Sequence, residues 1–257
     1  MIIASLLEDQ KTEKRISITP EIAKKYIGLG FEVIIIENYG KNLGFADKEY
    51  QDLGVKIINN EEEIVKNADI IIQLELPNKN IISFLKSNQT IIGVLNPYEN
   101  KDRLIEIAKK KINLFSLELL PRITRAQSMD ILSSQANLAG YKAVIESFAT
   151  FKKAIPMMMT AAGTVPAAKV LVVGAGVAGL QAIATAKRMG AIVYATDVRI
   201  ASKEQVESLG GKFLMVESSE NLETKGGYAK ETSEDFKKKQ EELLNETLKK
   251  IDIIICT

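Results

Sequence analysis

Three glycines and one aspartate have the residue types and the spacing to hold a dinucleotide. Residues 168–197 read AKVLVVGAGVAGLQAIATAKRMGAIVYATD: an apolar run meets Gly174, Gly176 and Gly179, and a helical pattern, a second apolar run and Asp197 follow. In such a unit the first glycine permits the tight turn, the second lets backbone approach a pyrophosphate, and the third lets the helix pack closely on the strand. The helix N-terminus then offers N–H groups and a favourable dipole to the phosphates.

The nucleotide-binding residues expected from this pattern form two groups. The backbone of the turn supplies the first group, which is Gly174, Ala175, Gly176, Val177, Ala178 and Gly179. The loop after the next strand supplies Asp197, Val198 and Arg199. A carboxylate at Asp197 accepts from both ribose hydroxyls and repels a 2′-phosphate, which favours NAD over NADP. Arg199 acts in the opposite direction, because an arginine in that loop can hold such a phosphate.

The composition limits the chemistry of this site. The 257 residues include no histidine, the side chain that dehydrogenases most often use to move a proton. A reaction here therefore uses Lys, Asp, Glu or Tyr for proton transfer, or it needs none. The one cysteine, Cys256, excludes an internal disulfide and a cysteine-rich metal site, so we expect no metal. A net charge of +1 gives no global field to attract nucleic acid.

The elements before the glycine turn alternate between apolar runs and helical patterns. Runs typical of strands occupy residues 2–6, 33–36, 55–58, 70–72, 91–95 and 114–117. Helical patterns occupy residues 20–28, 46–53, 61–66 and 100–111, the first with Thr19 as its cap and Pro20 as its first residue. This alternation predicts an α/β fold with a mainly parallel sheet covered by helices. We expect this N-terminal α/β domain over residues 1–130, without a glycine fingerprint of its own.

The pattern changes after Leu120. The stretch PRITRAQSMD, residues 121–130, predicts a loop. Residues 131–151 have small and apolar side chains at helical spacing and predict one long helix that joins two Rossmann-like domains. The methionines at 157–159 are expected to fill irregular core or interface space rather than to bind metal. The nucleotide-binding domain is expected over residues 131–257.

Beyond Asp197 the alternation continues to the end of the chain. Helical patterns at residues 201–209 and 233–250 alternate with apolar runs at 213–216 and 251–256, the latter expected to be buried. The polar segment 217–231 predicts an exposed, mobile loop. A Rossmann half normally continues after such a last strand, so we expect the sequence to be incomplete at its C-terminus. With no run long enough to span a bilayer and no secretory pattern, we expect a chain that faces the cytosol.

Three stretches together resemble the NAD(H)-binding component of proton-translocating nicotinamide nucleotide transhydrogenase, in the alanine dehydrogenase/transhydrogenase superfamily. These are PRITRAQSMDILSSQANLAGYKAV, VLVVGAGVAGLQAIATAKRMGAIVYATDVR and GGYAKE, of which RAQSMD is the most specific part. The resemblance implies direct hydride transfer between NAD(H) on this chain and NADP(H) on a partner domain, coupled to proton movement through a membrane-spanning component. It also implies a homodimer, peripheral to the cytoplasmic face of the inner membrane through its partner subunits.

The same resemblance implies roles for individual residues. The arginine, glutamine, aspartate and serine of that family's loop match Arg122, Gln127, Asp130 and Ser133, which would hold the nicotinamide and its ribose. Asp197 matches the acid that binds the adenosine ribose, and Tyr228 lies in a segment similar to the loop that closes over bound nucleotide. Hydride transfer between two nicotinamides releases no substrate proton, so such a site needs alignment and can lack a general base.

Two other functions stay open at this stage. The pattern EKRISITP resembles alanine dehydrogenase, in which Arg15 would bind a substrate carboxylate. The lysine and histidine which that family uses fall near Gln73 and Asn96, and neither matches. A non-catalytic NAD-binding module is the second alternative, and it would bind NADH without transferring hydride.

Overall fold

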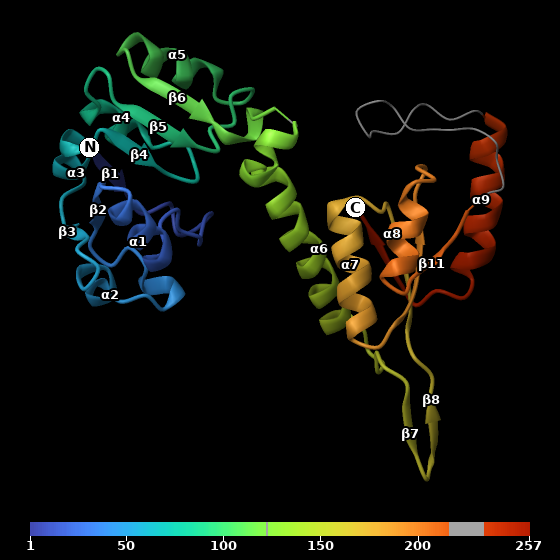
Figure 1. Cartoon of the computed structure of the whole chain (residues 1–257). Coiled ribbons are helices and arrows are strands. Elements are labelled where there is room, and N and C mark those ends of the chain that lie inside the picture. Colours follow the sequence, from blue (N-terminus) through green and yellow to red (C-terminus); the bar gives the residue numbers. More distant parts are fainter. Residues whose placement is uncertain (122, 216–233) are drawn as a thin grey trace. The chain divides into compact units, whose positions relative to one another are not determined.

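The computed structural model describes residues 1–121, 123–215 and 234–257. The chain divides into two compact units, Met1–Ile131 and Leu132–Thr257. Each unit contains a parallel sheet with helices packed against it (Figure 1). The expected α/β class with two Rossmann-like domains is therefore confirmed, and the long helix α6 (Ile131–Thr150) begins at the boundary between the units.

The first unit is built on a six-stranded sheet of order β3-β2-β1-β4-β5-β6, in which every pair is parallel. Its strands are β1 (Ile2–Ser5), β2 (Glu32–Ile36), β3 (Lys56–Ile58), β4 (Ile70–Ile72), β5 (Thr90–Gly93) and β6 (Asn113–Ser116). Its helices are α1 (Pro20–Gly28), α2 (Asp47–Gln51), α3 (Glu61–Asn67), α4 (Lys79–Phe84) and α5 (Lys101–Lys109), with the 3₁₀ helices η1 (Lys41–Leu43), η2 (Leu117–Leu119) and η3 (Thr124–Met129).

Local capping explains where these helices begin. Thr19 accepts a hydrogen bond from the N–H of Ile22 and Pro20 opens α1, as the sequence predicts. Helix α4 lies in a segment without an expected element. Asn78 caps it by accepting from the N–H of Ile81, and the helix buries Ile81 and Ile82. Its six residues are too short to display a helical period, so only the cap could have indicated it.

The second unit has a four-stranded parallel sheet of order β11-β10-β9-β12. Its strands are β9 (Lys169–Val173), β10 (Ile192–Thr196), β11 (Lys212–Phe213) and β12 (Ile253–Cys256). Besides α6, its helices are α7 (Val177–Arg188), α8 (Ser202–Ser208) and α9 (Glu234–Leu248). Helix α7 packs on β9, β10 and β12, and α6 runs beside α7 (Figure 1). The fully buried Val170, Val172 and Ile183 are part of this unit's core.

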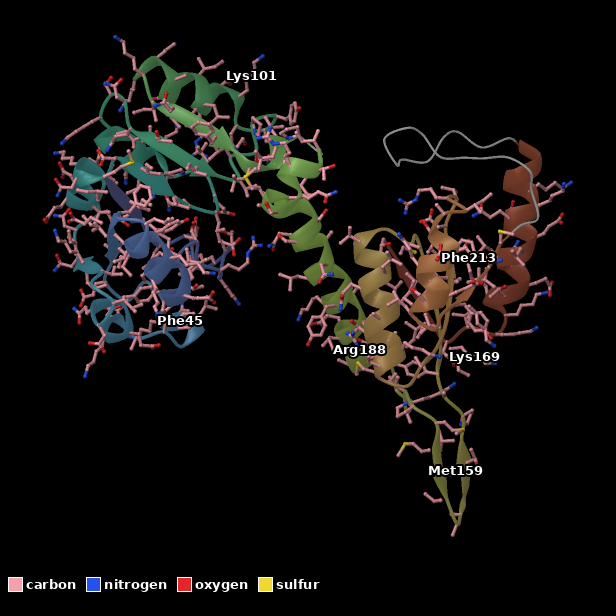
Figure 2. The ribbon with its side chains drawn as sticks, viewed as in Figure 1. Phe45, Lys101, Met159, Lys169, Arg188 and Phe213 are labelled. Carbon is pink, nitrogen blue, oxygen red and sulfur yellow. The ribbon has the colours of Figure 1, made fainter. Side chains whose placement is uncertain are left out.

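A projecting hairpin corrects one expectation about packing. Strands β7 (Met158–Thr160) and β8 (Gly163–Val165) pair antiparallel and extend away from the parallel sheet (Figures 1 and 2). Met157, Met158 and Met159 are 60%, 51% and 72% exposed. They therefore do not fill core space, and a role at an interface stays a prediction.

Two smaller differences concern η3 and β12. The 121–130 segment contains the 3₁₀ helix η3, which forms around the buried Ala126. Strand β12 is buried on one face only, because Ile254 is 51% exposed between the buried Ile253 and Ile255. The expected mobile loop over residues 217–231 lies outside the described residues. None of the helices that the structure describes is long and apolar enough to cross a membrane.

Candidate nucleotide-binding site

Two of the three glycines in the turn after β9 are required by the fold itself. Gly174 has a φ of +96°, in the left-handed region that favours glycine, and a β-carbon there would lie 2.6 Å from the carbonyl oxygen of Thr257. A β-carbon on Gly179 would lie 1.9 Å from the carbonyl oxygen of Gly174. Any side chain at Gly179 would therefore push α7 away from the turn. These contacts confirm the close helix packing that the sequence predicts.

Gly176 is different, because packing does not require a glycine there. Its φ of −76° suits any residue, and among the described residues the nearest atom to the place that a β-carbon would take is Arg199 Nη2, at 3.9 Å. The position is otherwise open on the side that a β-carbon would fill. An open backbone at the second glycine fits the close approach of a phosphate group.

The first turn of α7 follows directly from this open position. Ala175 is buried and Val177, the first helical residue, is 43% exposed. The first N–H groups of a helix have no partner within it, and the helix dipole favours an anion beside them. Lys187 and Arg188 lie in the last turn of α7, where cations complement the dipole. The N-terminus of α7 is thus suited to hold a pyrophosphate.

The Asp197 carboxylate lies beside the same turn, directly after β10. Its Oδ2 accepts from the backbone N–H of Ala175 at 2.7 Å, and its Oδ1 accepts from the backbone N–H of Arg199 at 2.8 Å. The Arg199 side chain adds two contacts of 2.9 Å each, Nε to Oδ1 and Nη2 to Oδ2. Val198, half-buried, lies between the two charged residues in the chain.

The electrostatics of Asp197 follow from these contacts. Burial acts to raise its pKa, but the hydrogen bonds from the Arg199 side chain and from the backbone N–H groups of Arg199 and Ala175 outweigh it. The pKa of Asp197 is therefore lowered, and the group is ionised at neutral pH. A carboxylate held in this way beside a glycine turn is the expected partner of a ribose diol.

The residues expected to hold the nicotinamide are distributed over the start of α6 and the segment before it. Gln127 is exposed within η3, and Asp130, half-buried, follows that helix directly. Ser133 is half-buried in the first turn of α6. Gln127 and Asp130 belong to the first unit and Ser133 to the second. Arg122 and Tyr228 lie outside the described residues.

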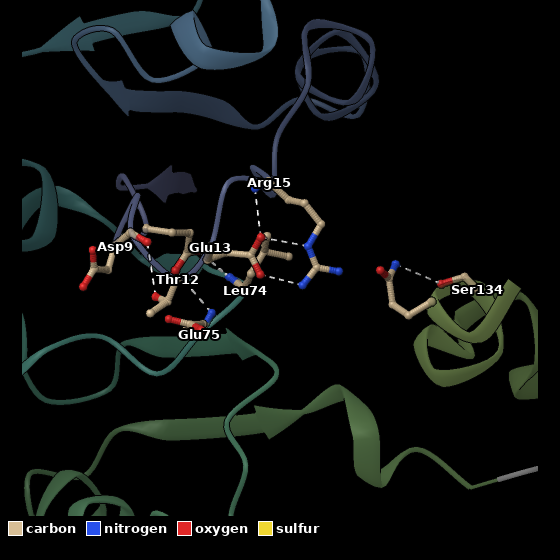
Figure 3. Close-up of polar contacts among 9 residues, drawn as sticks. Asp9, Thr12, Glu13, Arg15, Leu74, Glu75 and Ser134 are labelled. Atoms are coloured by element: carbon tan, nitrogen blue, oxygen red, sulfur yellow. Dashed lines mark hydrogen bonds and ion pairs between the residues drawn. The ribbon is translucent and has the colours of Figure 1, made fainter. Parts of the chain in front are cut away.

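Arg15, the residue expected to bind a carboxylate in the alanine dehydrogenase alternative, is paired within its own segment. Its Nε and Nη2 donate to the two oxygens of Glu13 at 2.8 and 2.5 Å (Figure 3). Gln73 is buried at the end of β4, and Asn96 has a φ of +45°, a conformation that asparagine tolerates. Both offer neutral amides, which do not act as bases. Neither of these two positions therefore holds a lysine or a histidine that could act as a base.

Family comparisons agree with this arrangement. Residues 6–139 match the family model described as alanine dehydrogenase/PNT, N-terminal domain. Residues 143–257 match the model described as alanine dehydrogenase/PNT, C-terminal domain. The chain belongs to the alanine dehydrogenase/PNT family.

Within the alanine dehydrogenase/PNT family two similar relatives share one name, that of the first part of NAD(P) transhydrogenase subunit alpha. The protein from Rickettsia prowazekii is 49% identical over 261 residues, covering all of this chain and 68% of that protein. The protein of the same name from Rhodospirillum rubrum is 48% identical, covering all of this chain and 69% of its own length. A crystal structure of transhydrogenase from Sinorhizobium meliloti matches with a TM-score of 0.86 at 43% identity over the whole chain and 69% of its own. The expected resemblance to transhydrogenase is therefore confirmed.

The structure also shows two contacts around this glycine turn that the sequence does not single out. Thr257 Oγ1 donates to the carbonyl oxygen of Gly174 at 3.0 Å, and Gly140 of α6 lies against Ala178 in the first turn of α7. Both depend on contacts between residues far apart in the chain. The local sequence therefore indicates neither contact.

Proposed function

We propose that this chain is the NAD(H)-binding component of a proton-translocating, Re/Si-specific NAD(P) transhydrogenase. In this role it exchanges hydride directly between NAD(H) on this chain and NADP(H) on a partner domain. The observation that carries the proposal is Gly176, a glycine that the fold does not need, in an open position between a helix N-terminus and an ionised Asp197. A ligand whose phosphate must approach the backbone explains why a side chain is absent there.

Each predicted residue has a separate task in this proposal. NAD(H), when bound, supplies the nicotinamide that carries the hydride. The backbone from Gly174 to Gly179 binds its pyrophosphate, and Asp197 accepts from the adenosine ribose. Arg122, Gln127, Asp130 and Ser133 orient the nicotinamide and its ribose, and Tyr228 helps to close the site over the nucleotide.

The absence of histidine is consistent with this reaction. Hydride transfer between two nicotinamides requires that the donor and acceptor carbons lie about 3 to 3.5 Å apart with water excluded. No substrate proton is released, so no residue has to act as a base. Amide, carboxylate and guanidinium groups suffice, because they fix orientation through directional hydrogen bonds.

The names of the relatives support a proposal for the partners of this chain, and its location is proposed with them. A name that denotes the first portion of an alpha subunit implies further subunits, and we propose an NADP-binding domain and a membrane-spanning proton channel as the partners of this chain. Proton translocation would take place in that membrane component, which would hold this chain at the cytoplasmic face of the inner membrane. We also propose a homodimer, for which the exposed side chains of Met157, Met158 and Met159 are candidate interface residues.

The test is an assay with three measurements on the purified chain. Binding of NADH and of NADPH would be titrated separately by nucleotide fluorescence. Hydride transfer would then be followed after addition of the NADP-binding domain of a transhydrogenase, with alanine plus NAD as the control substrate. We expect selective NADH binding, transfer that depends on the added domain, and no turnover of alanine.

The other outcomes separate the competing functions. Turnover of alanine would overthrow the proposal in favour of an amino-acid dehydrogenase. NADH binding without transfer would favour a non-catalytic nucleotide-binding module or a need for residues beyond those of this sequence, and a longer chain would distinguish the two. Failure to bind NADH would contradict every nucleotide-binding role of the glycine turn.

A further inference from the structure

Protein donors fill the acceptor positions of Asp197. A carboxylate has about four lone-pair sites, two on each oxygen. Oδ1 accepts from the backbone N–H and Nε of Arg199, and Oδ2 accepts from the backbone N–H of Ala175 and Nη2 of Arg199. A ribose diol that donates to this carboxylate must therefore displace some of these donors.

The four donors differ in whether they can move away from the Asp197 carboxylate. The Ala175 N–H belongs to the buried glycine turn, and the Arg199 N–H is two residues along the backbone from the carboxylate that it contacts. Neither can withdraw without movement of the main chain. The Arg199 side chain can withdraw by rotating about its own bonds, and it is 25% exposed whereas that of Asp197 is 6% exposed.

The number of acceptor positions that the Arg199 side chain occupies on Asp197 equals the number of hydroxyls on the ribose. Withdrawal of the Arg199 side chain vacates one acceptor position on Oδ1 and one on Oδ2. An adenosine ribose has a 2′-hydroxyl and a 3′-hydroxyl to donate. The guanidinium thus occupies the part of Asp197 that the diol would use.

Arg199 also lies beside the phosphate turn. Its Nη2 is 3.9 Å from the place that a β-carbon on Gly176 would take. A guanidinium that leaves Asp197 therefore starts from a position between that carboxylate and the glycine turn. A cation in that position favours the binding of a nucleotide that carries a phosphate on this ribose, because guanidinium groups bind phosphate in a bidentate manner.

We propose that Arg199 is a specificity-determining place-holder, which occupies the ribose-binding positions of Asp197 in the nucleotide-free chain and leaves them when NAD(H) binds. This inference rests on the proposed nucleotide site. It has two consequences: Arg199 competes with the NAD(H) ribose for Asp197, and its displaced charge lessens the discrimination that Asp197 exerts against a 2′-phosphate. Removal of the guanidinium should therefore sharpen selectivity.

The experiment compares Arg199→Met with the wild-type chain. Methionine keeps an unbranched stem but has neither the charge nor the donors. Dissociation constants for NADH and NADPH would be measured by fluorescence titration at fixed pH and salt. We expect Arg199→Met to bind NADH more tightly and NADPH more weakly, so that the NADH-to-NADPH affinity ratio rises by about tenfold, the value of one charge-assisted hydrogen bond.

A second measurement, of the melting temperature with and without NADH, distinguishes displacement of Arg199 from a merely structural effect. Arg199→Met leaves Asp197 with fewer donors, so the nucleotide-free variant should unfold at a lower temperature. NADH replaces those donors with its own hydroxyls and should therefore raise the melting temperature of the variant more than that of wild type. Arg199→Lys, which keeps a charge without the bidentate geometry, should have an affinity ratio between the other two.

Two results would overturn the inference while leaving the proposed function intact. The first is a wild-type chain that binds NADH and loses binding in Asp197→Asn, with an unchanged affinity ratio in Arg199→Met. The second is weaker binding of both nucleotides by the same factor in Arg199→Met, which would make Arg199 a general phosphate anchor. Absence of NADH binding to the wild-type chain would refute the proposed function itself.

Discussion

Gly140 of α6 faces the carbonyl oxygen of Ala178 in α7 so closely that a β-carbon on Gly140 would lie 2.0 Å from that oxygen. Asn137 Nδ2 donates to Gln181 Oε1 at 3.2 Å across the same pair of helices. Helix α6 thus contacts the first turn of α7, whose N–H groups we propose to face the pyrophosphate. The geometry of the proposed pyrophosphate site therefore depends on how closely α6 packs against α7 at Gly140.

Gly140→Ala should therefore disturb both stability and binding. Because the carbonyl of Ala178 belongs to the helix backbone, α6 and α7 must separate to admit a methyl group. We expect a loss of about 1–3 kcal/mol in the free energy of unfolding, as for other overpacked sites, together with weaker NADH binding. Thermal denaturation and nucleotide titration would measure the two effects.

Gly28→Ala is the matched control for that change. Gly28 is the last residue of α1, and among the described residues nothing lies within 4 Å of a β-carbon there. Alanine should stabilise this helical position by about 0.5–1 kcal/mol. An equal response of Gly140→Ala and Gly28→Ala would refute the close contact between α6 and α7.

Gly176→Ala and Gly179→Ala should separate binding from folding. A β-carbon on Gly176 would make only an ordinary contact, 3.9 Å from Arg199 Nη2, so Gly176→Ala should unfold at nearly the wild-type temperature and yet lose NADH affinity, because its methyl group blocks the phosphate. A β-carbon on Gly179 meets the carbonyl of Gly174 at 1.9 Å, so Gly179→Ala should lower the melting temperature as well. Undiminished NADH binding by a folded Gly176→Ala would remove the observation on which the proposed function rests.

The sequence was informative where the requirement was local. The glycine turn, the start of α1 and the strand before Gly174 depend on backbone conformation, on capping and on a short run of β-branched residues, all of which are visible in neighbouring residues. The position of Asp197 directly after β10 could be predicted for the same reason. Asp197 follows the strand after the turn at the spacing that the fold imposes.

The rest depended on tertiary contacts. The hairpin strands β7 and β8 have three residues each and every one is exposed, so no apolar alternation was available to indicate them. The chemistry of methionine favours core or interface positions for residues 157–159, and only their exposure decides against the core. The position of Arg199 in the loop after β10 predicts a phosphate ligand, whereas its ion pair with Asp197 depends on side-chain conformation, which the sequence does not show.

Tyr39→Phe should destabilise the first unit through hydrogen bonds alone. The Tyr39 hydroxyl, buried after β2, lies 2.8 Å from Ser5 Oγ and accepts from the N–H groups of Ser17 and Ile18 at 3.0 and 3.1 Å. Phenylalanine keeps the ring but leaves these groups without that partner, which should cost about 1–3 kcal/mol. Chemical denaturation would measure the loss.

Tyr98→Phe provides the comparison for that variant. Tyr98 is 86% exposed, so removal of its hydroxyl should change the free energy of unfolding by no more than about 0.5 kcal/mol. If both tyrosine variants had the wild-type free energy of unfolding, the hydrogen bonds of the Tyr39 hydroxyl between the end of β1 and the segment before α1 would not contribute to stability.

The ionisation of Asp197 should give the second unit a distinct acid dependence. Burial acts to raise the pKa of Asp197, and the hydrogen bonds from Arg199 and Ala175 lower it further than burial raises it. A carboxyl group with a lowered folded-state pKa stabilises the fold above its unfolded pKa, near 3.8, and loses that contribution as the pH falls through the folded value. The melting-temperature difference between wild type and Asp197→Asn should therefore stay constant from pH 7 to about pH 4 and shrink only below it. A difference that already shrank near pH 6 would mean that burial outweighs the donors and that Asp197 is partly protonated at that pH.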